Sequence, residues 1–149
     1  MDITEAGQAL YIACEMERRA IRLYERALLL FDDAACREAV AAMLKEERRH
    51  LMQFEAIGAQ TPGFERGQAL SAQAAQVIFS GGLVEAQRKG AFASAQALFR
   101  YAAGEEETAV KRYGEFAACL TGEAAAAFSA IAEQEKHHLV WLQEQLNQK

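Results

Sequence analysis

The feature that most constrains the fold is a pattern of apolar residues that occurs twice in the chain. Each occurrence has two long segments in which apolar side chains recur every three or four residues, the spacing of one helix face. The first occurrence covers about residues 4–58 and the second about residues 91–147. Adding 89 to the apolar positions of the first segment, or 88 to those of the second, gives the corresponding later positions. The sequence therefore predicts a duplicated pair of helices.

Composition agrees with a helical fold. Alanine, the strongest helix former, occupies 32 of the 149 positions, whereas Ile, Val and Thr together occupy 15. The connection at about residues 59–90, in which we expect a short helix at about 68–79, is long enough to run back along a helix of about 36 Å. We therefore predict a single all-α domain over residues 1–149, a four-helix bundle with one long crossover between helices two and three, which is the ferritin-like topology.

Charge and cysteine content narrow the class of function. The net charge of -5 disfavours a nucleic-acid partner, because phosphate contacts need clustered Lys and Arg. No apolar run approaches the roughly 20 residues that span a bilayer, and the N-terminus does not resemble a signal peptide, so we expect a cytoplasmic protein with no membrane partner. The three cysteines form no C-x-x-C pair, which excludes a zinc ribbon or a rubredoxin-type iron site within this chain.

We call the recurring apolar positions of each long segment its apolar stripe. Each of the four stripes contains one glutamate where the spacing otherwise places an apolar residue. These glutamates are Glu17, Glu47, Glu106 and Glu135. His50 and His138 follow the second and the fourth of them by three residues, so each Glu-x-x-His pair lies on one helix face. Two single glutamates and two such pairs are the ligand set of dinuclear carboxylate sites in four-helix bundles.

Charge balance also favours a metal site. Four carboxylates in a bundle core repel one another and lose hydration, so they must be protonated or neutralised. Two divalent cations would balance the four negative charges and leave two neutral imidazoles. Oxygen and nitrogen ligands suit iron or manganese, and we predict two iron ions with manganese as the alternative. The helix register stays open by one residue, since Glu105 could replace Glu106 and His137 could replace His138.

Two tyrosines share the faces of the single glutamates. Tyr24 and Tyr113 each follow the glutamate of their own helix by seven residues. A tyrosine at this spacing either packs in the core or donates a hydrogen bond from its phenol to a ligand carboxylate. The sequence leaves both roles open.

The motifs ERRAIRLY and EETAVKRY, together with EERRH and EQEKHH, resemble those of the rubrerythrin branch of the ferritin-like superfamily. The resemblance covers both helix pairs, about two-thirds of the chain. It implies a non-haem di-iron centre that reduces hydrogen peroxide, with the six glutamates and histidines of the motifs as ligands. Those ligands would be Glu17, Glu47, His50, Glu106, Glu135 and His138.

This chain departs from the rubrerythrin pattern in two respects. Electrons usually come from a rubredoxin-like domain, which this chain lacks, so the resemblance implies a separate donor such as a rubredoxin. Typical members also carry a second glutamate three residues from the one on helix three, where this chain has Ala103 and Ala109.

Three functions follow from these patterns. The first is an oxidoreductase that reduces hydrogen peroxide or dioxygen at a di-iron centre with electrons from an external donor. The second is a ferroxidase or iron-handling protein of the ferritin type, and the third is a metal-free helical interaction module. We also expect a homodimer, with apolar surface from Phe92, Phe99, Phe116 and Trp141.

Overall fold

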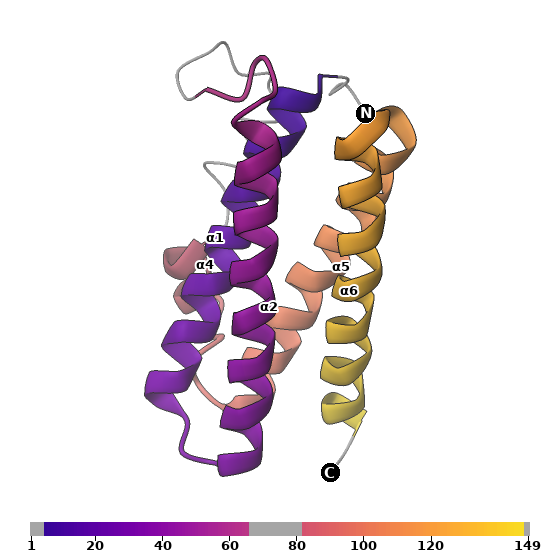
Figure 1. The fold of residues 1–149 in the computed structure, drawn as a ribbon. Coiled ribbons are helices and arrows are strands. Elements are labelled where there is room, and N and C mark those ends of the chain that lie inside the picture. The colour runs from indigo at the N-terminus through magenta and orange to yellow at the C-terminus, as the bar shows by residue number, and fades with distance from the viewer. Residues whose placement is uncertain (1–4, 66–81, 148–149) are drawn as a thin grey trace.

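Four long helices form a bundle (Figure 1). The computed structural model describes residues 5–65 and 82–147, and no strand occurs in these two ranges. The long helices are α1 (Ala6–Leu30), α2 (Ala34–Gly58), α5 (Ala95–Cys119) and α6 (Gly122–Asn147). A short helix that the sequence pattern does not indicate, α4 (Gly82–Arg88), lies beside α1. The prediction of an all-α bundle is confirmed, whereas the short helix expected at about 68–79 falls outside the described residues.

Side-chain caps determine where two of the long helices begin. Asp33 accepts a hydrogen bond of 2.8 Å from the backbone N–H of Cys36 at the start of α2. Ser94 accepts one of 3.0 Å from the backbone N–H of Ala97 at the start of α5. Each cap satisfies an amide that a helix N-terminus leaves unpaired. Because Ser94 is the cap, α5 begins later than residue 91, where the apolar spacing places its start.

Hydrogen bonds between the helices establish their directions. Tyr24 of α1 bonds to Glu106 of α5, and Tyr113 of α5 bonds to Glu17 of α1. This exchange of partners requires α1 and α5 to be antiparallel. The short connection at residues 31–33 folds α2 back along α1, so α2 and α5 run in the same direction (Figure 1). Part of the connection between α2 and α5 lies outside the described residues.

The interior of the bundle is divided along its length. One apolar cluster contains the rings of Phe54, Tyr113, Phe116 and Phe128, which contact one another edge-on or at a tilt. A second cluster contains Leu23, Val40, Met43, Leu98 and Leu142. On every long helix, buried glutamate or histidine residues separate the positions that belong to one cluster from those that belong to the other. A polar layer therefore crosses the bundle at mid-height.

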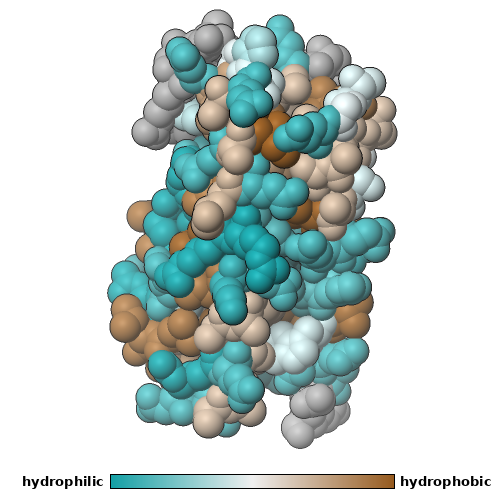
Figure 2. Space-filling model, in the orientation of Figure 1, coloured by the Kyte–Doolittle hydropathy of each residue, from teal (hydrophilic) through white to brown (hydrophobic). Residues whose placement is uncertain are grey.

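Few large apolar side chains are exposed in the part of the chain that the structure describes. Hydrophilic residues predominate on the face shown in Figure 2, with separate apolar patches among them. The most exposed large apolar residues of the described ranges are Leu29, Leu30, Met52, Val84 and Val140. Phe99 and Phe116 are buried, so their assignment to an apolar surface is wrong, and the homodimer stays a prediction. Within the described residues, no helix combines the length with the apolar character that a membrane span requires.

Candidate metal centre

The six residues predicted as metal ligands lie together in the polar layer. Glu17 comes from α1, Glu47 and His50 from α2, Glu106 from α5, and Glu135 and His138 from α6. None is more than 5% exposed. The helix register that the sequence left open is now defined, because Glu105 is partly exposed and His137 is exposed. Their neighbours Glu106 and His138 are the residues that point inward.

The donor atoms of these residues form two groups that share two members. One group consists of Glu17, Glu47, His50 and Glu135, and the other of Glu47, Glu106, Glu135 and His138. Within each group, one donor atom per residue lies within 4.8 Å of all the others. Glu47 and Glu135 belong to both groups, and each group adds one further glutamate and one histidine. Each group could hold a metal ion.

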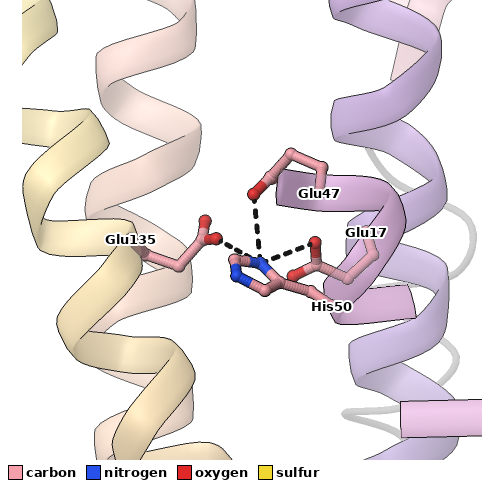
Figure 3. Close-up of side chains that lie close together, drawn as sticks. All are labelled: Glu17, Glu47, His50 and Glu135. Carbon is pink, nitrogen blue, oxygen red and sulfur yellow. Dashed lines mark ion pairs between the residues drawn. The ribbon is translucent and has the colours of Figure 1, made fainter. Parts of the chain in front are cut away.

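His50 shows how closely the donors of one group approach. Its Nδ1 atom lies 2.9 Å from Oε1 of Glu135, 3.2 Å from Oε1 of Glu47 and 3.5 Å from Oε1 of Glu17 (Figure 3). These carboxylates come from three helices and converge on one ring nitrogen. The geometry therefore gathers one nitrogen and three oxygen donors around a common point.

Each of the six residues also keeps one buried polar atom that lies near other donor atoms but forms no hydrogen bond of ordinary geometry among the described residues. These atoms are Glu17 Oε1, Glu47 Oε1, His50 Nδ1, Glu106 Oε2, Glu135 Oε1 and His138 Nδ1. An unpaired buried polar atom costs about 1–3 kcal/mol, so such atoms are normally bonded. Metal coordination would give all six atoms a partner. The donor set therefore fits metal ions.

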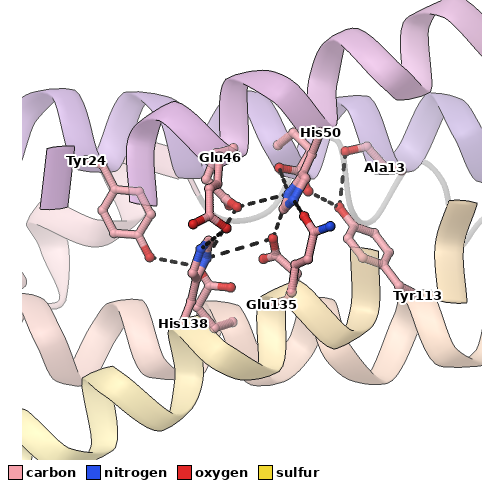
Figure 4. A network of polar contacts seen from close by, with 11 residues as sticks. Ala13, Tyr24, Glu46, His50, Tyr113, Glu135 and His138 are labelled. Carbon is pink, nitrogen blue, oxygen red and sulfur yellow. Dashed lines mark hydrogen bonds and ion pairs between the residues drawn. The ribbon is translucent and has the colours of Figure 1, made fainter. Parts of the chain in front are cut away.

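Two tyrosines hold the glutamates that are not shared between the groups. The hydroxyl of Tyr24 donates to Oε1 of Glu106, and that of Tyr113 donates to Oε2 of Glu17, both at 2.7 Å (Figure 4). Each bond joins one helix pair to the other. Each leaves the second oxygen of its carboxylate for the polar layer. The structure shows both of the roles that the sequence left open, because each tyrosine packs in an apolar cluster and also donates a hydrogen bond.

The histidines are held from their outer sides. Nε2 of His138 lies 3.1 Å from Oε2 of Glu46, and Nε2 of His50 lies 2.5 Å from Oε1 of Gln134 (Figure 4). An acceptor at Nε2 favours the neutral tautomer that turns the Nδ1 lone pair toward the donor groups. Glu46 and Gln134 were not predicted from the sequence. They occupy equivalent positions in the repeat, 88 residues apart, but the apolar spacing of their own helices does not mark them.

Burial and mutual repulsion make the polar layer retain protons. Burial raises the pKa values of Glu47 and Glu135 well above the ordinary 4.5, and repulsion from the neighbouring carboxylates raises them further. Burial alone would lower the pKa of His50, but the adjacent Glu135 and Glu17 raise it to about 10. Protons and metal ions therefore compete for the same donor atoms.

A cavity of about 640 Å³ connects the surface to the polar layer. It lies between α1 and α5 beside α4. Its lining includes Glu47 and Glu106 at the inner end, and the side chains of Arg19, Lys89 and Arg112. The cavity is therefore bordered by all four buried carboxylates, Glu17, Glu47, Glu106 and Glu135.

Replacing Tyr113 with phenylalanine is expected to lower the free energy of unfolding by about 1–3 kcal/mol. The phenyl ring keeps its packing, but the buried carboxylate of Glu17 loses its hydrogen-bond donor. Urea denaturation monitored by circular dichroism measures the change. Tyr101→Phe is the control. Tyr101 is partly exposed, so water can take over the hydrogen bonds of the lost hydroxyl. Equal losses in the two variants would contradict a specific role for Tyr113.

The described residues form a helical bundle. Its buried glutamate and histidine groups could hold a metal ion. No protein-family model matches the chain, and comparison with curated proteins and with solved structures gives no significant match.

Proposed function

We propose that the protein is a dinuclear metal protein that reduces hydrogen peroxide or dioxygen with two iron ions, manganese being the alternative metal. The observation that carries the proposal is the sharing of Glu47 and Glu135 between two four-residue donor groups. Glu47 and Glu135 would each supply an oxygen donor to both positions. One further glutamate and one histidine complete each position, as in the di-iron bundles that the motifs resemble.

The directions of the helices support the ferritin-like topology. The helix α2 ends at Gly58 at one end of the bundle, and α5 begins at Ala95 at the opposite end (Figure 1). A connection between two such parallel helices has to return along the length of the bundle. The helix α4 lies beside α1 between those two points. These positions favour the predicted long crossover between helices two and three.

The chemistry of the donors supports iron or manganese. Oxygen and nitrogen donors without thiolates suit these metals, and two divalent ions balance four carboxylates. When bound, the two ions supply the electrons that reduce the oxygen–oxygen bond of the oxidant. The protein's own residues bury the site, and the bonds from Tyr24 and Tyr113 orient two of its carboxylates. The cavity beside α4 gives a small oxidant a route to the donors.

In this proposal, the electrons come from a separate protein such as a rubredoxin. All three cysteines are free, and their spacing provides no iron–sulfur site within the chain. Free cysteines also favour a reducing compartment, the cytoplasm. Ala103 and Ala109, both buried, stand where a rubrerythrin carries its additional glutamate, so the reaction here uses four carboxylates rather than five.

Reaction of iron-loaded protein with peroxide tests the proposal. Protein purified without a chelating tag and loaded anaerobically should hold about two ferrous ions per chain. Both ions should be oxidised by one equivalent of hydrogen peroxide, since each iron gives one electron and the peroxide, with two protons, becomes two waters. Added reductant should then allow repeated turnover.

Two other results would contradict this function. Oxidation of many ferrous ions per chain inside a large hollow assembly, measured by light scattering, would indicate iron storage of the ferritin type. Absence of bound metal after anaerobic loading would leave the helical interaction module as the remaining hypothesis.

A further inference from the structure

The two histidines of the polar layer have chemically different acceptors, although they belong to repeated helix pairs. Glu46 and Gln134 occupy equivalent positions, each directly before one of the shared glutamates. Each contacts the histidine of the other helix pair, so Glu46 faces His138 and Gln134 faces His50. One ring nitrogen thus lies against a carboxylate and the other against an uncharged amide.

The remaining contacts of the two donor groups are of the same chemical kinds. Both groups contain the same shared pair of glutamates. Each has one further glutamate that accepts a tyrosine hydrogen bond of 2.7 Å, through Oε1 of Glu106 and Oε2 of Glu17. Each histidine turns its Nδ1 atom toward the shared carboxylates. Among the described residues that contact the donors, the acceptor at the histidine Nε2 atom is therefore the principal chemical difference between the groups.

A carboxylate at Nε2 changes the donor strength of an imidazole. It accepts the N–H bond more strongly than an amide does and makes the opposite nitrogen more basic toward a metal. The side chain of Glu46 is 38% exposed, so water can solvate its charge while it holds His138. Loss of such a partner typically weakens metal binding roughly 10–100-fold.

We infer that the two metal positions are unequal, and that Glu46 makes the position formed with Glu106 and His138 the tighter one. This inference rests on the proposed dinuclear centre. The tighter position fills first when metal is limiting. The position formed with Glu17 and His50, whose ring is held by Gln134, fills at higher metal concentration and releases its ion first. Glu46 acts here as a positioning residue, because it reaches the metal only through His138.

Single-position variants test the inference without the complication of repulsion between two bound ions. Glu17→Gln weakens the looser position and leaves the tighter one, whereas Glu106→Gln does the reverse. Cobalt(II) is the probe, because its visible spectrum reports coordination and calorimetry gives its affinity. We expect Glu17→Gln protein to bind one cobalt ion roughly 10–100-fold more tightly than Glu106→Gln protein does.

The outer acceptors are then exchanged in these two backgrounds. Glu46→Gln should remove the advantage of Glu17→Gln protein and leave the affinity of Glu106→Gln protein unchanged. Gln134→Glu should tighten binding by Glu106→Gln protein, a gain that general destabilisation cannot produce. Glu133→Gln is the charge-matched control, because Glu133 is exposed on α6 and pairs with Lys136.

The failures of the two proposals are distinguishable. If the unsubstituted protein binds two cobalt ions but Glu17→Gln and Glu106→Gln bind one ion with equal affinity, the inequality is wrong and the dinuclear centre stands. If the unsubstituted protein binds no cobalt, the dinuclear centre itself is wrong. An equal loss of affinity from Glu46→Gln in both backgrounds would also overturn the inference, since Glu46 contacts only one of the histidines.

Discussion

Glu135→Gln protein is expected to retain almost no iron after anaerobic loading and desalting, whereas Glu17→Gln protein retains about one ion per chain. The reason is that Glu135 belongs to both donor groups and Glu17 to only one. The same contrast is expected between Glu47, which is shared, and Glu106, which is not. Glutamine has nearly the volume of glutamate, so the substitutions preserve packing while removing a charged ligand. Elemental analysis of desalted protein measures the retained metal.

Glu133→Gln protein is the control for this series and should retain about two ions per chain. Glu133 lies on the same helix as Glu135, but its side chain is exposed and paired with Lys136. Circular dichroism establishes that each variant keeps its helices. Equal metal loss from Glu135→Gln and Glu17→Gln would contradict the sharing of Glu135 between two positions.

Metal-free protein is expected to lose stability as the pH rises from about 5 to 8. In the unfolded chain Glu47 and Glu135 release their protons near pH 4.5, but in the folded protein burial raises both pKa values well above it. Unfolding above pH 4.5 therefore releases protons, and a higher pH favours the unfolded chain. His50 acts in the same direction from about pH 6.5 upward, because its pKa rises to about 10 on folding. The pKa of Glu106 is lowered, so its opposite contribution is confined to the range below pH 4.5.

Metal-loaded protein should show the opposite dependence, because the ligands must lose their protons to bind a metal ion. At a free metal concentration of 100 times the dissociation constant, each site stabilises the fold by about 2.7 kcal/mol. Two sites together would raise the melting temperature by roughly 10–20 °C for a protein of this size. Thermal unfolding with manganese(II) or with a chelator, at several pH values, measures both trends.

The double variant Glu47→Gln, Glu135→Gln is the matched control for these melting curves. It should respond little to metal and lose much of the pH dependence of the metal-free protein. Unsubstituted protein that melts at the same temperature with metal and with chelator at every pH would exclude a stabilising metal site. That result would favour the interaction module.

The long helices and the six inward residues could be predicted because one signal identifies both. A glutamate such as Glu17 within an apolar stripe marks the buried face, and the same stripe defines the helix. The start of α5 could not be predicted this way. Residues 91–93 contain good helix formers, but Gly90 adopts a φ of 79° and Ser94 caps the helix after them. A helix cap and a positive φ leave the spacing of apolar residues unchanged, so this spacing does not reveal where the helix begins.

The outer partners of the histidines could not be predicted for a different reason. Glu46 lies one residue before a buried glutamate, on the side of α2 where charged residues are ordinarily solvated. Only the approach of α6 from the other helix pair distinguishes it from those solvated residues. Residues that gain a role through a distant segment carry no signal in the spacing of their own helix.

The division of the interior has a consequence for how the molecule opens. Each apolar cluster draws residues from all four long helices, so each half of the bundle can retain its own packing when the other half frays. Side-chain coupling between the two halves depends on the polar layer. In the metal-free protein, the protonated carboxyl groups of this layer form only short-range hydrogen bonds. Ions held by residues of all four helices would bind the halves into one cooperative unit. Metal occupancy would then determine whether the bundle opens from one end at a time or as a whole.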